Sequence, residues 1–136
     1  MPTKIVVDAS ALAAVLFGEP EAPKVAEQLG DSALAAPTLF SYEIANICWK
    51  KLRRHPEKRA TLLEAYSLLS RMEIEEVEVS VPEALLLADQ ENLTVYDASY
   101  LWLSRKLGLE LVTLDGDLNA AAAASPKRVL SSDDEK

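Results

Sequence analysis

Short apolar runs recur along the chain, separated by longer stretches in which apolar residues have helical spacing. The runs are rich in valine, leucine and isoleucine and are bounded by proline, glycine or acidic residues, as is typical of buried strands. We predict strands at residues 4–7, 33–36, 74–81, 109–114 and 127–130. Because most of these strands are separated by helices, the pattern predicts an α/β fold with a mostly parallel sheet.

The stretches between the strands carry the boundary signals of helices. Ser10 is a suitable N-cap for the first helix, and Gly30 and Gly108 follow the last residues of two others. The dipeptide His55-Pro56 separates two longer helices, because a residue before proline disfavours helical geometry. The predicted helices are 11–17, 20–29, Thr38 or Ser41 to Arg53, 56–71, 82–91, 96–107 and an alanine-rich helix from Leu118.

One domain is expected, because 136 residues without an internal repeat or a long linker suit a single core. We assign this domain to residues 1–131 and expect the acidic tail, 132–136, to be frayed. Asp8 interrupts the first apolar stretch, which argues against a signal peptide, and no apolar run approaches the ~20 residues of a membrane span. The single cysteine, Cys48, excludes an intramolecular disulfide framework. We therefore expect a cytoplasmic protein without a membrane partner.

Four acidic residues occupy positions that the predicted fold brings to one edge of the sheet. Asp8 and Asp115 directly follow buried strands, and Glu43 and Asp97 lie in the first turns of helices. Parallel strands end, and the helices after them begin, at the edge where open α/β sheets bind ligands. Each acid taken singly is better explained as a turn, cap or solvated residue. Four converging carboxylates, however, repel one another unless a cation stands among them.

Hard divalent cations such as Mg²⁺ and Mn²⁺ prefer oxygen ligands of this kind. A carboxylate site with open coordination positions suits metal-assisted hydrolysis of a phosphodiester, in which the metal activates water. The formal net charge of −8 has the wrong sign for gripping nucleic acid over a broad basic face. A nucleic acid substrate would therefore be held locally, through metal ions and a small basic patch.

Three segments resemble the motifs of the PIN-domain family and, within it, of the VapC toxins: VVDASAL at 6–12, SYEIANI at 41–47 and TVYDASYLWLSRKLGLELVTLDGDL at 94–118. The resemblance covers nearly the whole chain and implies a three-layer α/β/α PIN-like fold with a short, mostly parallel central sheet. It also implies Mg²⁺- or Mn²⁺-dependent endoribonuclease activity on RNA, a homodimer, and inhibition by a small antitoxin protein. The residues that match the catalytic, metal-binding acids of the family are Asp8, Glu43, Asp97 and Asp115.

Three further residues fall beside these acids. By the resemblance, Ser10 lies next to the metal site, a role that is compatible with an N-cap. Thr113 matches a family threonine that could hydrogen-bond a neighbouring carboxylate. Asp117 is either a participant in the metal site or the cap of the alanine-rich helix.

Positive charge is concentrated near the end of the predicted helix that carries Glu43. The candidate contact residues there are Lys50, Lys51, Arg53 and Arg54. Two interpretations remain open. The run is either a solvated helix end whose cations offset the helix dipole, or a contact for RNA phosphates or for an acidic segment of the antitoxin.

Two other functions are compatible with parts of the sequence. A binding or regulatory module could keep the PIN-like fold without catalysis, although all four acids are present. A receiver-like phospho-acceptor domain has a similar length and an acidic pocket, but it requires a lysine after a late strand, where this chain has Asp115. The four scattered glycines form no phosphate-binding loop, so we expect no nucleotide cofactor.

Overall fold

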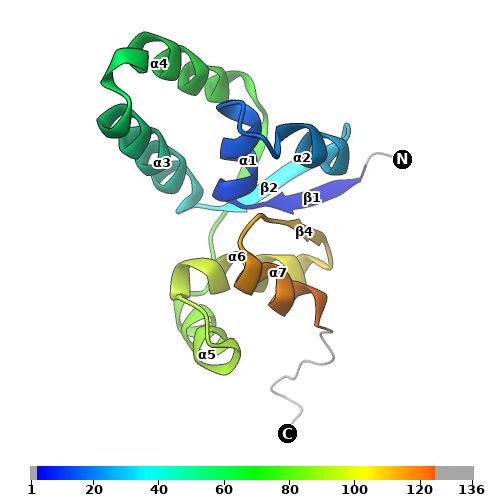
Figure 1. Cartoon of the computed structure of the whole chain (residues 1–136). Helices are drawn as coiled ribbons and strands as arrows, with labels where there is room; N and C mark the ends of the chain where they lie inside the picture. The colour runs from blue at the N-terminus through cyan, green and yellow to red at the C-terminus, as the bar shows by residue number, and fades with distance from the viewer. Residues whose placement is uncertain (1–2, 125–136) are drawn as a thin grey trace, which may run out of the picture.

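A four-stranded parallel sheet forms the centre of the molecule (Figure 1). The computed structural model of the chain describes residues 3–124. The order across the sheet is β3-β2-β1-β4, and every pairing is parallel, which confirms the predicted fold class. The strands are β1 (Lys4–Val7), β2 (Ala33–Pro37), β3 (Ile74–Val77) and β4 (Glu110–Val112).

Helices cover both faces of the sheet, so the molecule has three layers (Figure 1). The first group lies on one face: α1 (Ala9–Leu16), α2 (Ala22–Leu29), α3 (Phe40–Arg54) and α4 (Arg59–Ser67). The second group lies on the other: α5 (Val81–Glu91), α6 (Val95–Leu107) and α7 (Gly116–Ala123). The chain runs outward from β1 to β3 through the first group and returns past β1 to β4 through the second. The two directions place their helices on opposite faces, as right-handed crossovers require.

The core lies on both faces of β1, the strand between β2 and β4. Val6 and Val7 are fully buried, and Leu12 of α1, Phe40 of α3 and Leu103 of α6 belong to the same apolar cluster. Burying a side chain of this size contributes roughly 1.5–3 kcal/mol. A strand that is covered on both faces has no solvent side, which explains why successive residues of β1 are apolar. The carboxyl end of β1 is thereby held firmly in place.

The strand order reverses at β1, because β2 and β4 lie on opposite sides of it. At such a reversal the connections leaving the two neighbouring strands turn to opposite faces of the sheet. Open α/β sheets bind ligands beyond the carboxyl ends of the strands at this position. The fold therefore singles out the ends of β1 and β4.

The first helix begins earlier than predicted, because Asp8 rather than Ser10 is its N-cap. Asp8 has an extended backbone (φ −91°, ψ 168°), and its side chain accepts a hydrogen bond from the backbone N–H of Ala11. Ser10 already lies inside α1. At the other end of the chain Asp115, not Asp117, accepts a backbone hydrogen bond and caps α7. Both aspartates that follow a strand thus also start a helix.

Two predicted strands are shorter in the structure. The strand predicted over 74–81 ends at Val77, because Ser80 caps α5 and turns the following residues into helix. The strand predicted over 109–114 ends at Val112, where the chain begins the turn that leads to α7.

The helix predicted over 56–71 is not continuous, and that prediction was wrong. Lys58 departs from helical geometry (φ −102°, ψ 16°) and separates the first turn from the rest, and the end of the segment tightens to 3₁₀ geometry, so the segment has three parts. These are a 3₁₀ turn at Pro56–Lys58, α4, and a second 3₁₀ turn at Leu68–Arg71. The strand predicted at 127–130 and the tail lie outside the described residues. Within residues 3–124, no helix has the length and apolar character needed to cross a membrane.

Candidate active site

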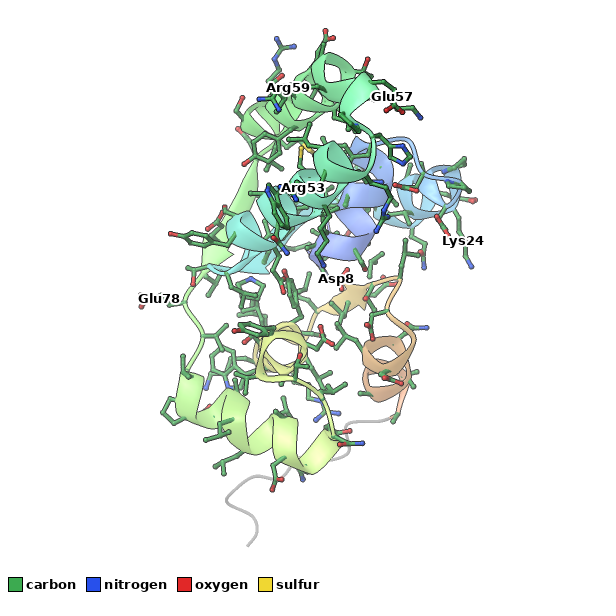
Figure 2. All side chains as sticks on the ribbon, turned by 60° about the vertical axis from the view of Figure 1, so that its left-hand side comes forward. Asp8, Lys24, Arg53, Glu57, Arg59 and Glu78 are labelled. Carbon is green, nitrogen blue, oxygen red and sulfur yellow. The ribbon has the colours of Figure 1, made fainter. Side chains whose placement is uncertain are left out.

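Asp8 is the one acidic residue within residues 3–124 that is almost fully buried, with 4% of its surface exposed. Figure 2 shows it between the two helix layers. Its backbone N–H donates to the carbonyl of Val112 over 3.1 Å, which ties it to the end of β4. Oδ1 accepts hydrogen bonds from Ser10 Oγ (2.7 Å) and the Ala11 N–H (3.0 Å), and Oδ2 accepts one from Thr113 Oγ1 (2.7 Å). Both oxygens are therefore satisfied, as burial of a carboxylate requires.

Two hydroxyl groups join Asp8 to the turn after β4. Ser10 Oγ donates to Asp8 and accepts a hydrogen bond from the backbone N–H of Leu114 over 3.1 Å. Thr113 Oγ1 also donates to Asp8 and accepts one from the N–H of Asp115 over 3.0 Å. Each hydroxyl thus fixes both the carboxylate and the backbone beside it. The turn that carries Asp115 is held against Asp8 in this way.

The remaining acids reach the same edge from three further elements. Glu43 lies in the first turn of α3, and Asp97 in the first turn of α6, where Thr94 accepts a hydrogen bond from its backbone N–H over 3.0 Å. Asp115 lies at the start of α7. Asp117, also in the first turn of α7, is exposed.

These acids lie close enough together to affect one another's ionisation. Burial raises the pKa of Asp8 above its ordinary 3.8, its hydrogen bonds oppose the rise, and Asp115 adds to it. Burial also raises the pKa of Glu43, which Asp8 and Asp97 raise further, while a hydrogen bond from Tyr100 opposes this. The pKa of Asp97 is raised by burial and then by Asp115 and Asp8. The structure thus gathers the four predicted acids into one region of mutually repelling charge.

The donor set of this region fits a hard divalent cation, because all of its donors are carboxylate oxygens. Within residues 3–124, however, no three His, Cys, Asp or Glu side chains lie close enough together to hold one metal ion as they stand. Like-charged side chains are expected to stand apart until a cation draws them together. Binding of an ion would therefore require side-chain rotation.

Tyr100 is a member of this region that is not among the predicted site residues. Its hydroxyl donates a 2.6 Å hydrogen bond to Oε1 of Glu43. Tyr100 follows Asp97 by three residues on α6, so helical spacing could have placed both on one face. Its bond to Glu43 could not have been predicted from a local pattern, because the two residues are 57 positions apart in the sequence.

The predicted basic residues near the end of α3 differ in exposure and pairing. Lys51 forms an ion pair with Glu19 and is partly buried. Lys50, Arg53 and Arg54 are exposed. Figure 2 shows Arg53 on α3. The exposed positive charge is therefore smaller than the sequence suggests.

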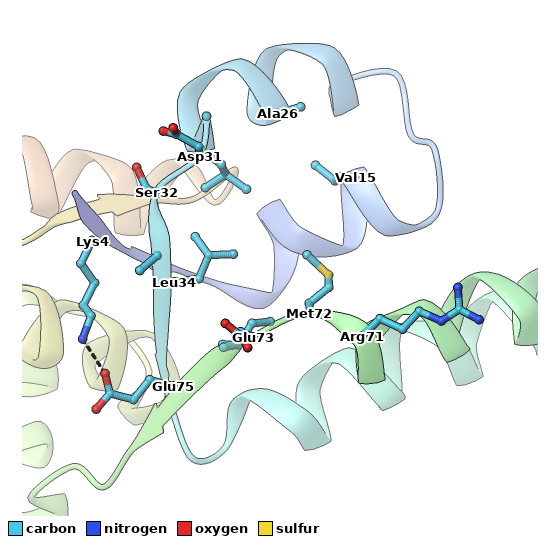
Figure 3. A pocket seen from close by; sticks show the side chains of 14 residues that line it. Lys4, Val15, Ala26, Asp31, Ser32, Leu34, Arg71, Met72, Glu73 and Glu75 are labelled. Atoms are coloured by element: carbon cyan, nitrogen blue, oxygen red, sulfur yellow. Dashed lines mark hydrogen bonds and ion pairs between the residues drawn. The ribbon is translucent and has the colours of Figure 1, made fainter. Parts of the chain in front are cut away.

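A hollow of about 1060 Å³ lies at the opposite edge of the sheet (Figure 3). Its wall includes the beginnings of β1, β2 and β3, with the apolar side chains of Leu29 and Leu34 and an ion pair of 2.5 Å between Lys4 and Glu75. None of the four acids lines it. This hollow and the carboxylate region thus lie at opposite ends of the strands, and the chemistry of the side chains points to the carboxylate region.

The fold and these acids define the class of protein. The sequence signature of the PIN domain matches residues 5–124. Because the match extends over most of the chain, the chain belongs to the PIN-domain family.

Two relatives from Pyrobaculum aerophilum are similar over most of their length. The chain is 36% identical to ribonuclease VapC3 over 121 residues, which is 85% of this chain and 92% of that protein. It is 34% identical to exonuclease VapC9 over 130 residues, 88% of this chain and 86% of that protein.

Two solved structures share the fold. PAE2754 from Pyrobaculum aerophilum superposes with a TM-score of 0.68 and 33% identity, over 90% of this chain and 89% of that chain. VapC20 of Mycobacterium tuberculosis, a sarcin-ricin loop cleaving toxin, superposes with a TM-score of 0.60 over 86% of this chain and 94% of that chain. Its identity is 23%, so this second similarity bears on the fold alone. The expected three-layer PIN-like fold is confirmed.

Proposed function

We propose that this chain is a Mg²⁺- or Mn²⁺-dependent endoribonuclease and the toxin of a type II toxin–antitoxin pair. One observation carries the proposal: Asp8, Glu43, Asp97 and Asp115 come from four different elements to the edge where the strand order reverses. Membership of the PIN-domain family and the names of its VapC relatives support it.

The four carboxylates are the residues that would hold the metal. When bound, a divalent ion supplies an activated water and offsets negative charge on the scissile phosphate. Asp8 suits the role of a fixed ligand, because three hydrogen bonds hold its carboxylate in place. Ser10 and Thr113 would act by keeping it there. Glu43 would bind the metal directly or through water, or orient the attacking water.

Hydrolysis would add water across one P–O bond of the RNA. The oxygen of water joins phosphorus, the bond from phosphorus to the 3′ oxygen breaks, and that oxygen takes up a proton. The products carry a 3′-hydroxyl and a 5′-phosphate. No cyclic phosphate forms, because the 2′-hydroxyl is not the nucleophile. Asp117, exposed at the start of α7, raises the pKa of Asp97 and would contribute only to the charge around the site.

The exposed basic residues of α3 are proposed to contact RNA phosphates. α3 begins beside the acids at Glu43, and Arg53 lies ten residues further along, about 15 Å at the rise of an α-helix. The guanidinium of Arg53 lies 5.5 Å from the ring centroid of Trp49, which keeps the side chain near the helix surface. An acidic antitoxin segment is the alternative occupant of the same residues.

Charge reversal tests this contact. Replacing Arg53 and Arg54 by glutamate should weaken the binding of RNA. The slope of log K against the logarithm of the salt concentration should become shallower by about 0.7 for each phosphate contact that is lost. Lys24→Glu with Arg59→Glu changes the net charge equally on other exposed helices and serves as the matched control. RNA binding that falls equally in both variants would leave the run at the end of α3 as solvated surface.

A homodimer and an antitoxin are the proposed protein partners. Several large apolar side chains are exposed on the helices, as interfaces require. The most exposed are Tyr42 (83%), Leu86 (69%), Val81 (65%), Tyr96 (64%), Leu85 (56%) and Trp49 (53%). Sedimentation equilibrium of the purified chain would measure the dimer. A monomer at all accessible concentrations would contradict it.

The experiment that tests the function is cleavage of RNA in linear and circular form. We expect cutting that requires Mg²⁺ or Mn²⁺, stops with EDTA, and is lost in Asp97→Ala but kept in Asp89→Ala, which changes an exposed aspartate on α5. Circular RNA has no ends, so only an endonuclease can cut it. The relative VapC9 is named an exonuclease, and this substrate distinguishes the two activities. A folded protein that cuts neither form under any metal would instead favour a silent PIN-fold module that regulates a partner.

A further inference from the structure

The ring of Tyr100 lies in the core, and its hydroxyl reaches the carboxylate region. Tyr100 is 1% exposed and is among the largest fully buried side chains. Its hydroxyl crosses from α6 to α3 and donates to Oε1 of Glu43 over 2.6 Å. The backbone N–H of Ala9, the residue after Asp8, approaches the phenol oxygen closely enough to lower its pKa. One oxygen atom thus touches or neighbours the elements that carry Asp8, Glu43 and Asp97.

The proton of this phenol stays in place. A tyrosine hydroxyl ordinarily has a pKa of about 10, so it carries its proton at neutral pH. The hydroxyl is therefore a donor throughout the physiological pH range. A buried hydroxyl needs a hydrogen-bond partner, and a carboxylate is a stronger acceptor than a neutral group. The bond between Tyr100 and Glu43 satisfies both groups.

A hydrogen-bond donor stabilises the carboxylate of Glu43 against the repulsion of its neighbours. Asp8 and Asp97 both repel its charge, and its side chain is only partly buried, so solvent offers it an alternative position. Within residues 3–124 its Oε1 accepts a hydrogen bond from Tyr100, and its Oε2 accepts none. Tyr100 therefore restrains one oxygen and leaves the other available.

We propose that Tyr100 is a positioning residue, whose hydroxyl holds the carboxylate of Glu43 beside Asp8 and Asp97. The inference rests on the proposed function, since it deepens the account of the same site. Tyr100 touches neither the substrate nor the reacting atoms in this scheme and acts through Glu43. A purely structural tyrosine would instead act through its ring, which fills the core between α6 and the sheet.

Substitution by phenylalanine separates these roles, because it keeps the ring and removes only the hydroxyl. We expect Tyr100→Phe to fold normally, to bind Mn²⁺ about tenfold more weakly and to lose about tenfold in kcat with little change in KM. Tyr66→Phe is the matched control: Tyr66 packs against the core from α4, and its hydroxyl bonds no residue within 3–124. Tyr66→Phe should leave the Mn²⁺ affinity, kcat and KM unchanged.

A double-mutant cycle tests whether Tyr100 acts through Glu43. If it does, Tyr100→Phe should have no further effect on kcat or Mn²⁺ affinity once Glu43→Gln is present. Effects that multiply would show two independent roles and overturn the proposal. Mn²⁺ affinity and kcat that are the same in Tyr100→Phe as in the unaltered chain would also overturn it.

Crystal structures of the metal-free chain and of Tyr100→Phe make the result independent of activity. We expect the Glu43 carboxylate to leave its place beside Asp8 and Asp97 when the hydroxyl is removed. If it leaves but the unaltered chain cuts no RNA, the positioning role stands and the proposed function fails. A Glu43 carboxylate that keeps the same position in both crystals overturns the positioning role, whatever the activity.

Discussion

The two edges of the sheet differ in what they hold. The amino edge, where the strands begin, has a hollow of about 1060 Å³, and its charged groups, such as Lys4 and Glu75, are exposed and paired with one another. The carboxyl edge, where the strands end, holds four acids whose like charges are brought together, and within residues 3–124 no lysine or arginine pairs with any of them. Space is abundant at the first edge, and unfavourable charge is concentrated at the second.

In this molecule, concentrated charge is a better sign of a functional site than a large hollow. Burying a carboxylate beside others lowers the stability of the fold unless something compensates. Such arrangements cluster at functional sites for that reason. The hydrogen bonds that Ser10 and Thr113 give to Asp8 compensate only in part, since its pKa is still raised. A divalent cation would supply the remainder.

Removing one acid at the carboxyl edge should have the largest effect. Asp8→Asn keeps the size of the side chain but gives a poorer ligand for a hard cation, so cleavage should fall by roughly a thousandfold or more. Circular dichroism would establish that the variant is folded. A folded variant with full activity would remove Asp8 from the proposed site and blur the distinction between the two edges.

Removing a supporting hydroxyl should have a smaller effect. Thr113→Val keeps the shape but takes a donor from Asp8 and an acceptor from the N–H of Asp115. Hydrogen bonds to charged groups contribute about 1.5–3 kcal/mol, so we expect roughly a 10- to 100-fold lower cleavage rate. Thr113→Ser restores the hydroxyl and should recover most of the rate. Equal rates for the valine and serine variants would show that the hydroxyl is not required.

The pH dependence of stability should reveal the repulsion itself. The folded pKa values of Asp8, Glu43 and Asp97 are raised, so the folded state holds protons more tightly than the unfolded chain. Their contribution to stability is fully present below the ordinary values, 3.8 for Asp and 4.5 for Glu, and is lost as pH rises through the raised values. In EDTA, the Tm of the unaltered chain should therefore fall relative to that of Asp8→Asn as pH rises from this range towards neutrality.

Metal should reverse that loss. At 100 times its Kd, a metal ion that binds only the folded state stabilises it by about 2.7 kcal/mol. The gain should be greater at neutral pH than in acid, because the ligands must be deprotonated. A Tm difference between the unaltered chain and Asp8→Asn that does not vary with pH would contradict the repulsion.

Changes at the amino edge should have the smallest effect. Lys4→Ala removes an exposed ion pair with Glu75, which contributes about 0.2–1 kcal/mol at most. Ala26→Trp places a large ring beside the hollow. We expect both variants to cut RNA within about twofold of the unaltered rate, as for surface changes away from a site. A large loss of cleavage in either would make the amino edge part of the function.

Sequence patterns predicted the class and layers of the fold, because those depend on apolar runs and on the order of strands and helices. They were less successful at the ends of elements. Asp8 caps α1 and Ser80 caps α5, which follows from backbone geometry that a local pattern does not specify. The break at Lys58 depends likewise on the path of the chain between α3 and α4.

The candidate site was predictable where a residue's place follows from its element. Asp8 and Asp115 follow strands and Glu43 and Asp97 begin helices, so topology alone carries them to one edge. Contacts between side chains distant in sequence were not predictable. The bond from Tyr100 to Glu43 spans 57 positions, and other contacts of this kind, such as the pairing of Lys51 with Glu19, depend on the finished packing.

The most direct test of the central claim is a crystal grown with Mn²⁺ and examined by anomalous scattering. We expect Mn²⁺ peaks bound by Asp8, Asp97 and Asp115 at the carboxyl edge, with Glu43 directly bound or linked through water. We expect no Mn²⁺ peak in the hollow at the amino edge. Well-ordered carboxylates without a Mn²⁺ peak among them, at concentrations that support cleavage, would contradict the central claim.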